Sequence, residues 1–207
     1  MDNLQRTVRN LLLVLALLVT GGLLVQGQAA EPSGLAKAYF AGGCFWCMEE
    51  VFENVAGVTA VTSGFMGGKV ERPTYEEVST GGTGHAESVE VLYDPAKVSY
   101  ATLLGAFWRN VDPVTPNAQF CDRGNQYRAA IFYLTDEQQR LAEDSKRVLE
   151  DSHRFTKPIV TEIVKATQFY PAEEHHQDFY KKNPIRYKFY KYNCGRADRL
   201  EELWGAP

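Results

Sequence analysis

The chain has 207 residues, of which 44% are hydrophobic, and a formal net charge of -4. This length is enough to bury one substantial core, so the composition favours a single catalytic domain. The acidic balance argues against nucleic-acid binding, which needs a clustered excess of Lys and Arg to neutralise phosphates. One basic cluster, at residues 181–188, is offset by nearby acidic residues and indicates a solvated face.

The first thirty residues have the order of a secretory signal. Arg6 and Arg9 precede an apolar run from Leu11 to Val25, and small and polar residues follow as far as Ala30. The run is shorter than most bilayer-spanning helices, which favours cleavage over permanent anchoring. The protein is therefore expected to be exported, to the periplasm or another extracytoplasmic space. The expected divisions are a signal peptide or N-terminal membrane anchor at 1–30, a linker at 31–36 and a catalytic domain at 37–207.

Beyond the linker, the residue patterns alternate between strands and helices. Phe45, Met48 and Phe52 recur at three- and four-residue spacing, which is typical of a helix with one buried face. Strands are expected at 37–40, 58–65, 85–93, 127–134 and 159–165, and helices at 44–57, 99–108 and 135–153. The stretch after Asn183 is expected to be irregular. Mixed strands and helices in one unit predict an α+β or α/β sandwich.

Four cysteines are the most chemically informative residues. Cys44 follows a glycine pair and opens a predicted helix, whose positive end stabilises a thiolate. Cys44 and Cys47 form a C-x-x-C, a spacing shared with thiol–disulfide exchange enzymes. Zinc is disfavoured because Cys121 and Cys194 each lack a nearby Cys or His to complete a second ligand pair. These residues leave open a catalytic thiol, a thiol–disulfide oxidoreductase that uses Cys44 and Cys47, and a disulfide-stapled binding protein.

Four short motifs occur in order along the domain. They are Gly43-Cys44-Phe45-Trp46, Pro73-Thr74-Tyr75-Glu76, Gly84-His85-Ala86-Glu87, and the stretch from Asp122 to Arg128 that contains Gly124, Gln126 and Tyr127. In this order the sequence resembles the A-type peptide methionine sulfoxide reductases, from about Lys37 to Asn183. Four motifs in the right order are far more specific than any one of them.

The resemblance implies a fold and a set of site residues. The fold is a two-layer α/β sandwich of α+β class, with a mixed sheet, a ferredoxin-like core and an irregular C-terminal tail. The implied site residues are Cys44 as nucleophile, Glu87 as general acid, Phe45 and Trp46 as walls for the substrate methyl group, and Tyr75, Asp122 and Tyr127 around the sulfoxide oxygen. A sulfoxide sulfur becomes electrophilic when its oxygen is hydrogen-bonded or protonated, which two phenols and a protonated carboxylic acid can achieve. Burial beside aromatic rings would keep Glu87 protonated.

The resemblance also implies a recycling step. Oxygen transfer leaves a sulfenic acid on Cys44, which a second thiol attacks to form a disulfide. Family members commonly carry the recycling cysteine on a C-terminal tail, so Cys194 is the expected resolving thiol, with Cys47 as the alternative. Cys47 stands where the family frequently has glycine. Cys121, beside Asp122, could be a third resolving thiol or a small packing residue, and a packing or supporting role is favoured.

The expected reaction is reduction of the S epimer of methionine sulfoxide, free or in oxidised proteins and peptides. This is protein repair under oxidative stress. The resemblance implies no metal or organic cofactor and a thioredoxin-like reductant as electron source. No nucleic-acid partner is expected, and the protein is expected to be a monomer. The alternative, thiol–disulfide exchange through Cys44 and Cys47, would have no need of Glu87 or of paired tyrosines around the thiol.

Overall fold

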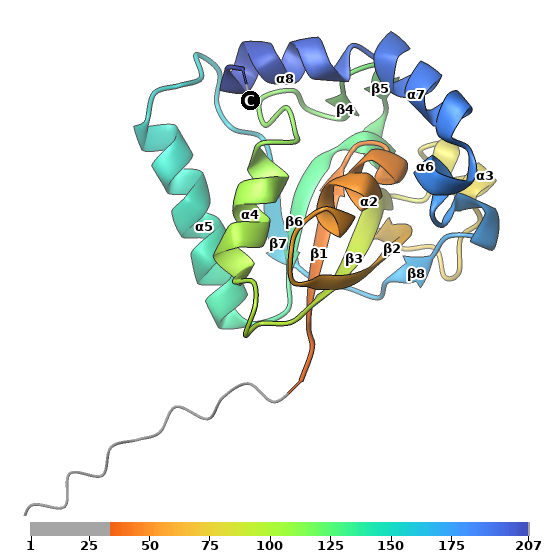
Figure 1. The fold of residues 1–207 in the computed structure, drawn as a ribbon, viewed down its shortest axis with the longest axis horizontal. Coiled ribbons are helices and arrows are strands. Elements are labelled where there is room, and N and C mark those ends of the chain that lie inside the picture. Colours follow the sequence, from red (N-terminus) through yellow and green to blue (C-terminus); the bar gives the residue numbers. More distant parts are fainter. Residues whose placement is uncertain (1–33, 207) are drawn as a thin grey trace, which may run out of the picture. The chain divides into compact units, whose positions relative to one another are not determined.

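The computed structural model describes residues 34–206, so the segment expected to be a signal or anchor, 1–30, lies outside the described residues. Figure 1 shows the arrangement of the domain. Its strands are β1 (Ala36–Gly42), β2 (Val58–Met66), β3 (Ala86–Tyr93), β4 (Ala118–Gln119), β5 (Asp122–Arg123), β6 (Ala129–Tyr133), β7 (Glu162–Lys165) and β8 (Tyr170–Pro171). Its α-helices are α2 (Phe45–Glu53), α3 (Tyr75–Ser79), α4 (Tyr100–Trp108), α5 (Asp136–Asp151), α6 (Phe179–Lys182), α7 (Pro184–Asn193) and α8 (Arg196–Trp204).

A mixed sheet forms the centre of the domain, with the strand order β7-β6-β1-β3-β2-β8. β1 lies between β6 and β3 and is antiparallel to both, whereas β6 and β7 are parallel. Parallel neighbours need a crossover connection, which α5 supplies here. A mixed sheet with packed helices confirms the predicted α+β class.

The main core lies between the sheet and the helices α2 and α4, which cover one of its faces (Figure 1). Ala38 and Phe40 of β1 point into this core, while Tyr39 between them joins a smaller cluster on the other face. The Phe40 ring stacks on Phe52 of α2 at 4.7 Å and on Phe107 of α4 at 5.3 Å between ring centroids. This packing holds the end of β1 and the start of α2 in one place, and both segments carry site residues.

The elements expected between residues 37 and 165 all occur, with bounds that shift by a few residues. The expectation of an irregular C-terminal tail is wrong, because α7 and α8 occupy it. α7 begins with Pro184, a residue favoured in the first helical turn. Its helical period is hard to recognise because Ile185 and Phe189 face solvent, so they do not mark a buried side. Among residues 34–206, no helix combines the length and apolar character needed to cross a membrane.

Candidate active site

The turn between β1 and α2 positions the first cysteine. Gly43 has a φ of +80°, and a Cβ at this position would lie 2.5 Å from the Cβ of Gln119. Only glycine combines this backbone conformation with such a close approach. Cys44 follows as the N-cap of α2 and makes no side-chain capping hydrogen bond. Its Sγ is therefore left for chemistry at the helix N-terminus.

A buried carboxylic acid lies beside this turn. Glu87 of β3 is only 2% exposed, and its Oε2 accepts a hydrogen bond of 3.0 Å from the backbone N–H of Phe45. Burial raises the pKa of Glu87 to about 8, with smaller contributions from the charges of Asp122 and Cys47. Glu87 therefore carries a proton at neutral pH and can donate it.

A small cavity of about 50 Å³ joins the nucleophile to the acid. It is lined by every residue expected in the site except the resolving cysteine, together with Tyr190: Cys44, Phe45, Trp46, Tyr75, Glu87, Asp122, Tyr127 and Tyr190. Since one water in the liquid takes about 30 Å³, the cavity admits little more than the end of one side chain. A larger hollow of about 480 Å³, beside Arg109 and Trp204, has no cysteine in its lining.

One side of the cavity is an aromatic wall. The Phe45 and Trp46 rings lie 6.3 Å apart, and the Trp46 indole stacks on Phe179 at 3.8 Å. The indole Nε1–H also donates to His176 Nδ1 at 3.3 Å, so the indole is held both by stacking and by a hydrogen bond. This wall can receive a small apolar group such as a methyl.

The other side of the cavity is polar. Tyr75 starts α3, Tyr127 ends a short 3-10 turn, and Asp122 lies in β5. Burial raises the pKa of Tyr75 to about 12 and raises that of Tyr127 further, so both hydroxyls keep their protons. The Asp122 Oδ2 accepts a 2.5 Å hydrogen bond from the Tyr190 hydroxyl, and burial raises the pKa of its carboxyl. The cavity therefore offers several hydrogen-bonding groups to a polar atom.

Cys44 and Cys47 are buried together on the first turn of α2, and their sulfurs are not bonded to each other. Burial, together with the hydrogen bond to Cys47, raises the pKa of Cys44 well above its usual value. The hydrogen bond from Cys44 lowers the pKa of Cys47 to about 6, and the charges of Arg196 and Lys191 act in the same direction. At neutral pH the negative charge of the pair therefore lies on Cys47. Burial of Cys44 opposes the stabilisation of a thiolate by the helix N-terminus, and its role as the nucleophile stays a prediction.

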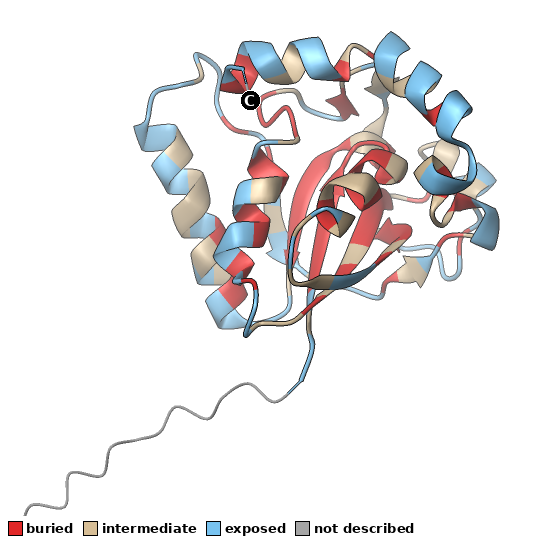
Figure 2. Cartoon of the chain, viewed as in Figure 1, coloured by how far each residue is buried: buried red, intermediate tan, exposed pale blue. Residues whose placement is uncertain are grey.

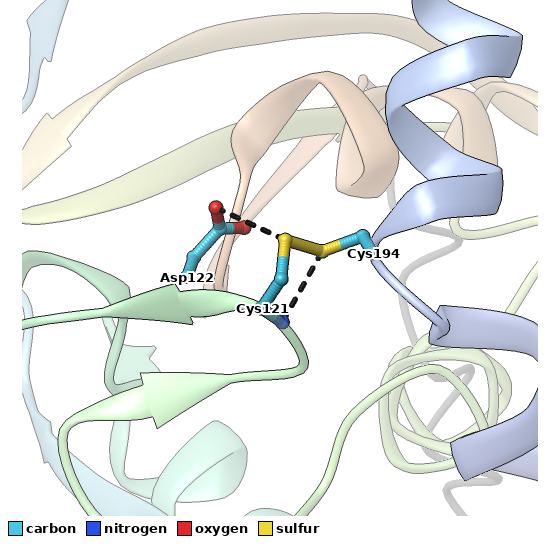
Figure 3. A group of neighbouring side chains, drawn as sticks. All are labelled: Cys121, Asp122 and Cys194. Atoms are coloured by element: carbon cyan, nitrogen blue, oxygen red, sulfur yellow. Dashed lines mark hydrogen bonds between the residues drawn. A yellow bond between two sulfur atoms is a disulfide. The ribbon is translucent and has the colours of Figure 1, made fainter.

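The other two cysteines form a disulfide at the edge of the site (Figure 3). Cys121 precedes β5 and Cys194 caps the end of α7, with 4.8 Å between their Cα atoms. Figure 3 also places the Asp122 carboxylate beside this bond, 3.6 Å from the Cys121 sulfur. The prediction that Cys194 resolves the sulfenic acid stays a prediction, and it now requires this disulfide to open first. Cys121, for which a packing or supporting role was favoured, is covalently bonded to Cys194.

Several residues of the site were missed by the sequence reasoning. Tyr190 lines the cavity, Phe179 and His176 hold Trp46, and the Tyr187 hydroxyl donates to Glu50 at 2.6 Å beside the thiol pair. They all come from residues 176–190, a region interpreted as polar or irregular. The aromatic density of that region was the only signal that could have indicated them.

Two groups of potential ligands bring three side chains close together. In the first, the sulfurs of Cys121 and Cys194 are bonded to each other and are not available as thiolate ligands. In the second, Glu49 already accepts hydrogen bonds from the backbone N–H of Asp178 and the hydroxyl of Ser63. Asp122 of the first group lines the cavity of Cys44, whereas no residue of the second group does.

A buried thiol, a protonated carboxylic acid and an aromatic wall around one small cavity define the class of protein: an oxidoreductase that acts through cysteine. The family model for peptide methionine sulfoxide reductase matches residues 36–207. The chain therefore belongs to the peptide methionine sulfoxide reductase family, and its reaction is the reduction of methionine sulfoxide.

Individual relatives agree with the family model. MsrA of Halalkalibacterium halodurans is 52% identical over 171 residues, which cover 83% of this chain and 97% of that protein. MsrA of Bacillus subtilis is 52% identical over 169 residues, covering 82% and 96%. Among solved structures, methionine sulfoxide reductase A of Corynebacterium diphtheriae has a TM-score of 0.66 at 34% identity, covering 74% of this chain and 77% of that one. Reduced Mxr1 of Saccharomyces cerevisiae has a TM-score of 0.70 at 29% identity, covering 74% and 88%.

Proposed function

We propose that Cys44 attacks the sulfur of a methionine S-sulfoxide while Glu87 gives its proton to the sulfoxide oxygen. The observation that carries this proposal is the burial of a protonated Glu87 in the same small cavity as Cys44. A neutral carboxylic acid is the group that a developing negative charge on oxygen needs. A carboxylate with an ordinary pKa would repel that charge.

The thiol of Cys44 must lose its proton as it attacks. Cys47, its hydrogen-bond partner, is the nearest acceptor, because its own thiol is ionised above about pH 6. The net step transfers one oxygen atom from the substrate sulfur to the Cys44 sulfur. The substrate gains two electrons and becomes methionine, whereas Cys44 is oxidised to a sulfenic acid. The proton given by Glu87 stays on the sulfenic oxygen and leaves in the water formed at resolution, and Glu87 regains a proton when a dithiol donor later reduces the disulfide.

The preference for the S epimer follows from the family resemblance and has a geometric rationale in the cavity. We place the substrate methyl group against Phe45 and Trp46, and the oxygen towards Glu87 and the polar groups of Tyr75, Asp122 and Tyr127. With the methyl group and the oxygen both assigned to fixed walls and the sulfur next to Cys44, only one configuration at sulfur directs the rest of the methionine side chain out of the cavity. The small volume restricts entry to the end of a side chain, which suits free methionine sulfoxide and oxidised proteins or peptides alike.

Recycling is proposed to begin within the C-x-x-C. Cys47 now holds the proton that it took from Cys44. As its sulfur attacks the sulfenic sulfur of Cys44, this proton joins the departing hydroxyl, so that a Cys44–Cys47 disulfide and water form. Cys47 lies on the same helical turn as Cys44 and has a lowered pKa, and both features support this role. Cys194, the resolving thiol expected from the sequence, is held by Cys121 and can take part only after that bond is reduced. Resolution by Cys194 is therefore the second route.

A thioredoxin-like protein is the proposed source of the two electrons that reopen the disulfide. A solved structure holds Mxr1 of Saccharomyces cerevisiae in complex with Trx2, and Mxr1 shares the fold of this chain.

We propose that the enzyme repairs oxidised proteins outside the cytoplasm, because residues 1–30 have the order of a secretory signal or anchor. We further propose that it acts as a monomer. Detection of the cleaved or anchored form in cell fractions tests this location.

The deciding experiment is a single turnover of the reduced protein with each epimer of dabsyl-methionine sulfoxide, without added reductant. Methionine from the S epimer only, with a new Cys44–Cys47 bond found by mass mapping, is the expected result. A Cys44–Cys194 bond would transfer the resolving role to Cys194. Failure of both epimers to give methionine would overturn the assignment of Cys44 and Glu87.

A further inference from the structure

The outer face of α7 carries an exposed apolar stripe. Ile185, Phe189 and Tyr192 are 86%, 71% and 84% exposed, the three largest values among the large apolar residues of the described chain. Their spacing of four and three residues puts them on one side of the helix. In Figure 2 the outer surface of α7 is almost entirely exposed. Exposed apolar groups arranged as a stripe indicate a binding surface rather than scattered surface residues.

The stripe points away from the active site. Tyr187, Tyr190 and Cys194 occupy the opposite side of α7, where Tyr187 is buried and Tyr190 lines the cavity. A partner on the outer face would therefore be separated by the helix itself from the Cys121–Cys194 disulfide and from Cys44 and Cys47, which pack in one cluster with Tyr187. This placement argues against the electron donor as the occupant, because a donor must touch a disulfide sulfur to reduce it.

Cations flank the stripe. α7 contains Arg186, Lys188 and Lys191 and no acidic residue, in a chain whose net charge is -4. Lys191 pairs with Glu50, whereas Arg186 and Lys188 make no ion pair with any residue of the 34–206 range. Sequence reasoning interpreted this basic region as a solvated face. The structure combines it with the apolar stripe on one short, convex helix.

We propose that the outer face of α7 binds the surface of an anionic lipid membrane. Ile185, Phe189 and Tyr192 would enter the boundary between headgroups and acyl chains, and the flanking cations would reach the lipid phosphates. Long basic side chains beside an apolar face are suited to this, because their stems bury while their charges stay at the headgroups. This inference does not depend on the chemistry proposed for the cavity.

Binding to vesicles tests the proposal on the domain, residues 34–207. The family model matches residues 36–207, and 169 residues of this chain cover 96% of the Bacillus subtilis protein, so that relative is close in length to this domain. The probes are vesicles of phosphatidylcholine alone and vesicles that also contain phosphatidylglycerol, mixed with the protein and sedimented. We expect the protein to sediment with the anionic vesicles only, and less so as salt is added. Equal sedimentation with neutral vesicles, or none with either, would overturn the proposal.

Matched variants separate the α7 face from the rest of the surface. Ile185→Ser with Phe189→Ser, and separately Lys188→Glu, should each weaken binding to the anionic vesicles by about tenfold. Val148→Ser on α5 and the exposed Lys157→Glu are the controls and should bind like the parent. Turnover of free methionine sulfoxide should be the same in all of these variants. A concentration-dependent dimer in the ultracentrifuge that Phe189→Ser abolishes would assign the face to a second copy of the chain and overturn the membrane assignment.

Discussion

The two cysteine pairs differ in everything except the residue type. Cys44 and Cys47 share one helical turn, are buried, and remain reduced. Cys121 and Cys194 are 73 residues apart in the sequence and are joined at the edge of the cavity, where Cys121 is exposed. The first pair is tuned by burial and neighbouring charge, which set where its proton and its negative charge lie. The second pair connects two parts of the chain, so its effect on the site is positional.

The Cys121–Cys194 pair affects the cavity through two neighbouring residues that line it, Asp122 and Tyr190. Tyr190 lies one helical turn before Cys194, and its hydroxyl donates to Asp122, the residue after Cys121. The disulfide and this hydrogen bond therefore join the same two segments, α7 and the start of β5, at adjacent points. The pairs are chemically distinct, yet Cys44 of the first pair lines the same small cavity as Asp122 and Tyr190, the neighbours of the second pair.

Replacing individual cysteines should show the largest difference between the two pairs in the number of methionines formed per enzyme. Cys44→Ser should abolish methionine formation, because a serine hydroxyl is a far weaker nucleophile than a thiolate. With thioredoxin and its reducing system supplied, Cys47→Ser should stop after about one methionine per enzyme, since the sulfenic acid is not resolved. The double change Cys121→Ser and Cys194→Ser should keep multiple turnover within about tenfold of the parent. Chromatographic counting of methionine per enzyme measures all three.

The assignment of different roles to the two cysteine pairs would be wrong if the protein with both Cys121→Ser and Cys194→Ser also stopped after one methionine per enzyme. Cys194 would then be the resolving thiol, as the family resemblance implied, and the disulfide with Cys121 would be a resting state. The Cys47→Ser protein should in that case continue to turn over.

Removing the acid should have the next largest effect. Glu87→Gln should slow the single turnover by about 10²–10⁴-fold, the usual contribution of a general acid, while exchange with small disulfides stays the same. Activity of the parent should rise as Cys47 ionises near pH 6 and fall as Glu87 loses its proton near pH 8. Stopped-flow rates across this range should show the falling limb in the parent and not in Glu87→Gln. A falling limb that persists in the variant would show that another group is the acid.

The disulfide should matter more for stability than for chemistry. Its removal by Cys121→Ser with Cys194→Ser should lower the free energy of unfolding by about 2–4 kcal/mol, because the bond closes a long loop in the unfolded chain. Cys47→Ser, which breaks no covalent bond, should cost less. Urea unfolding without reductant measures the difference. Equal losses in the two proteins would contradict a structural role for the Cys121–Cys194 bond.

Loss of the hydrogen bond from Tyr190 to Asp122 should have the smallest effect on the rate of reduction. Tyr190→Phe removes the donor to Asp122 and a hydrogen bond that holds down the pKa of Cys44. The pKa of Cys44 should therefore rise, and the single turnover at neutral pH should slow by about tenfold or less, as expected for one hydrogen bond. Tyr192→Phe, on the exposed side of the same helix, is the matched control. An unchanged alkylation profile of Cys44 in Tyr190→Phe would rule out this coupling.

Local patterns made much of the domain predictable. The period of Phe45, Met48 and Phe52 marks α2 because these residues face a core, and the motifs around Cys44 and Glu87 indicated the two residues at the centre of the cavity. α7 was not predictable in this way, because its apolar residues face solvent and its inward side is polar and aromatic. Which cysteines pair was also not predictable, since four thiols allow three complete pairings and 73 residues separate the two that bond.

The position of the disulfide in the chain affects how the protein tolerates cleavage. The 73-residue segment that it closes contains the exposed connection between α5 and β7, where Arg154 is accessible to a protease. A cut there leaves two fragments that remain covalently attached, with Cys44 and Glu87 on one and α7 on the other. The nicked protein would hold together in oxidising surroundings and come apart when they become reducing, so the lifetime of a damaged copy is coupled to the redox state of its compartment.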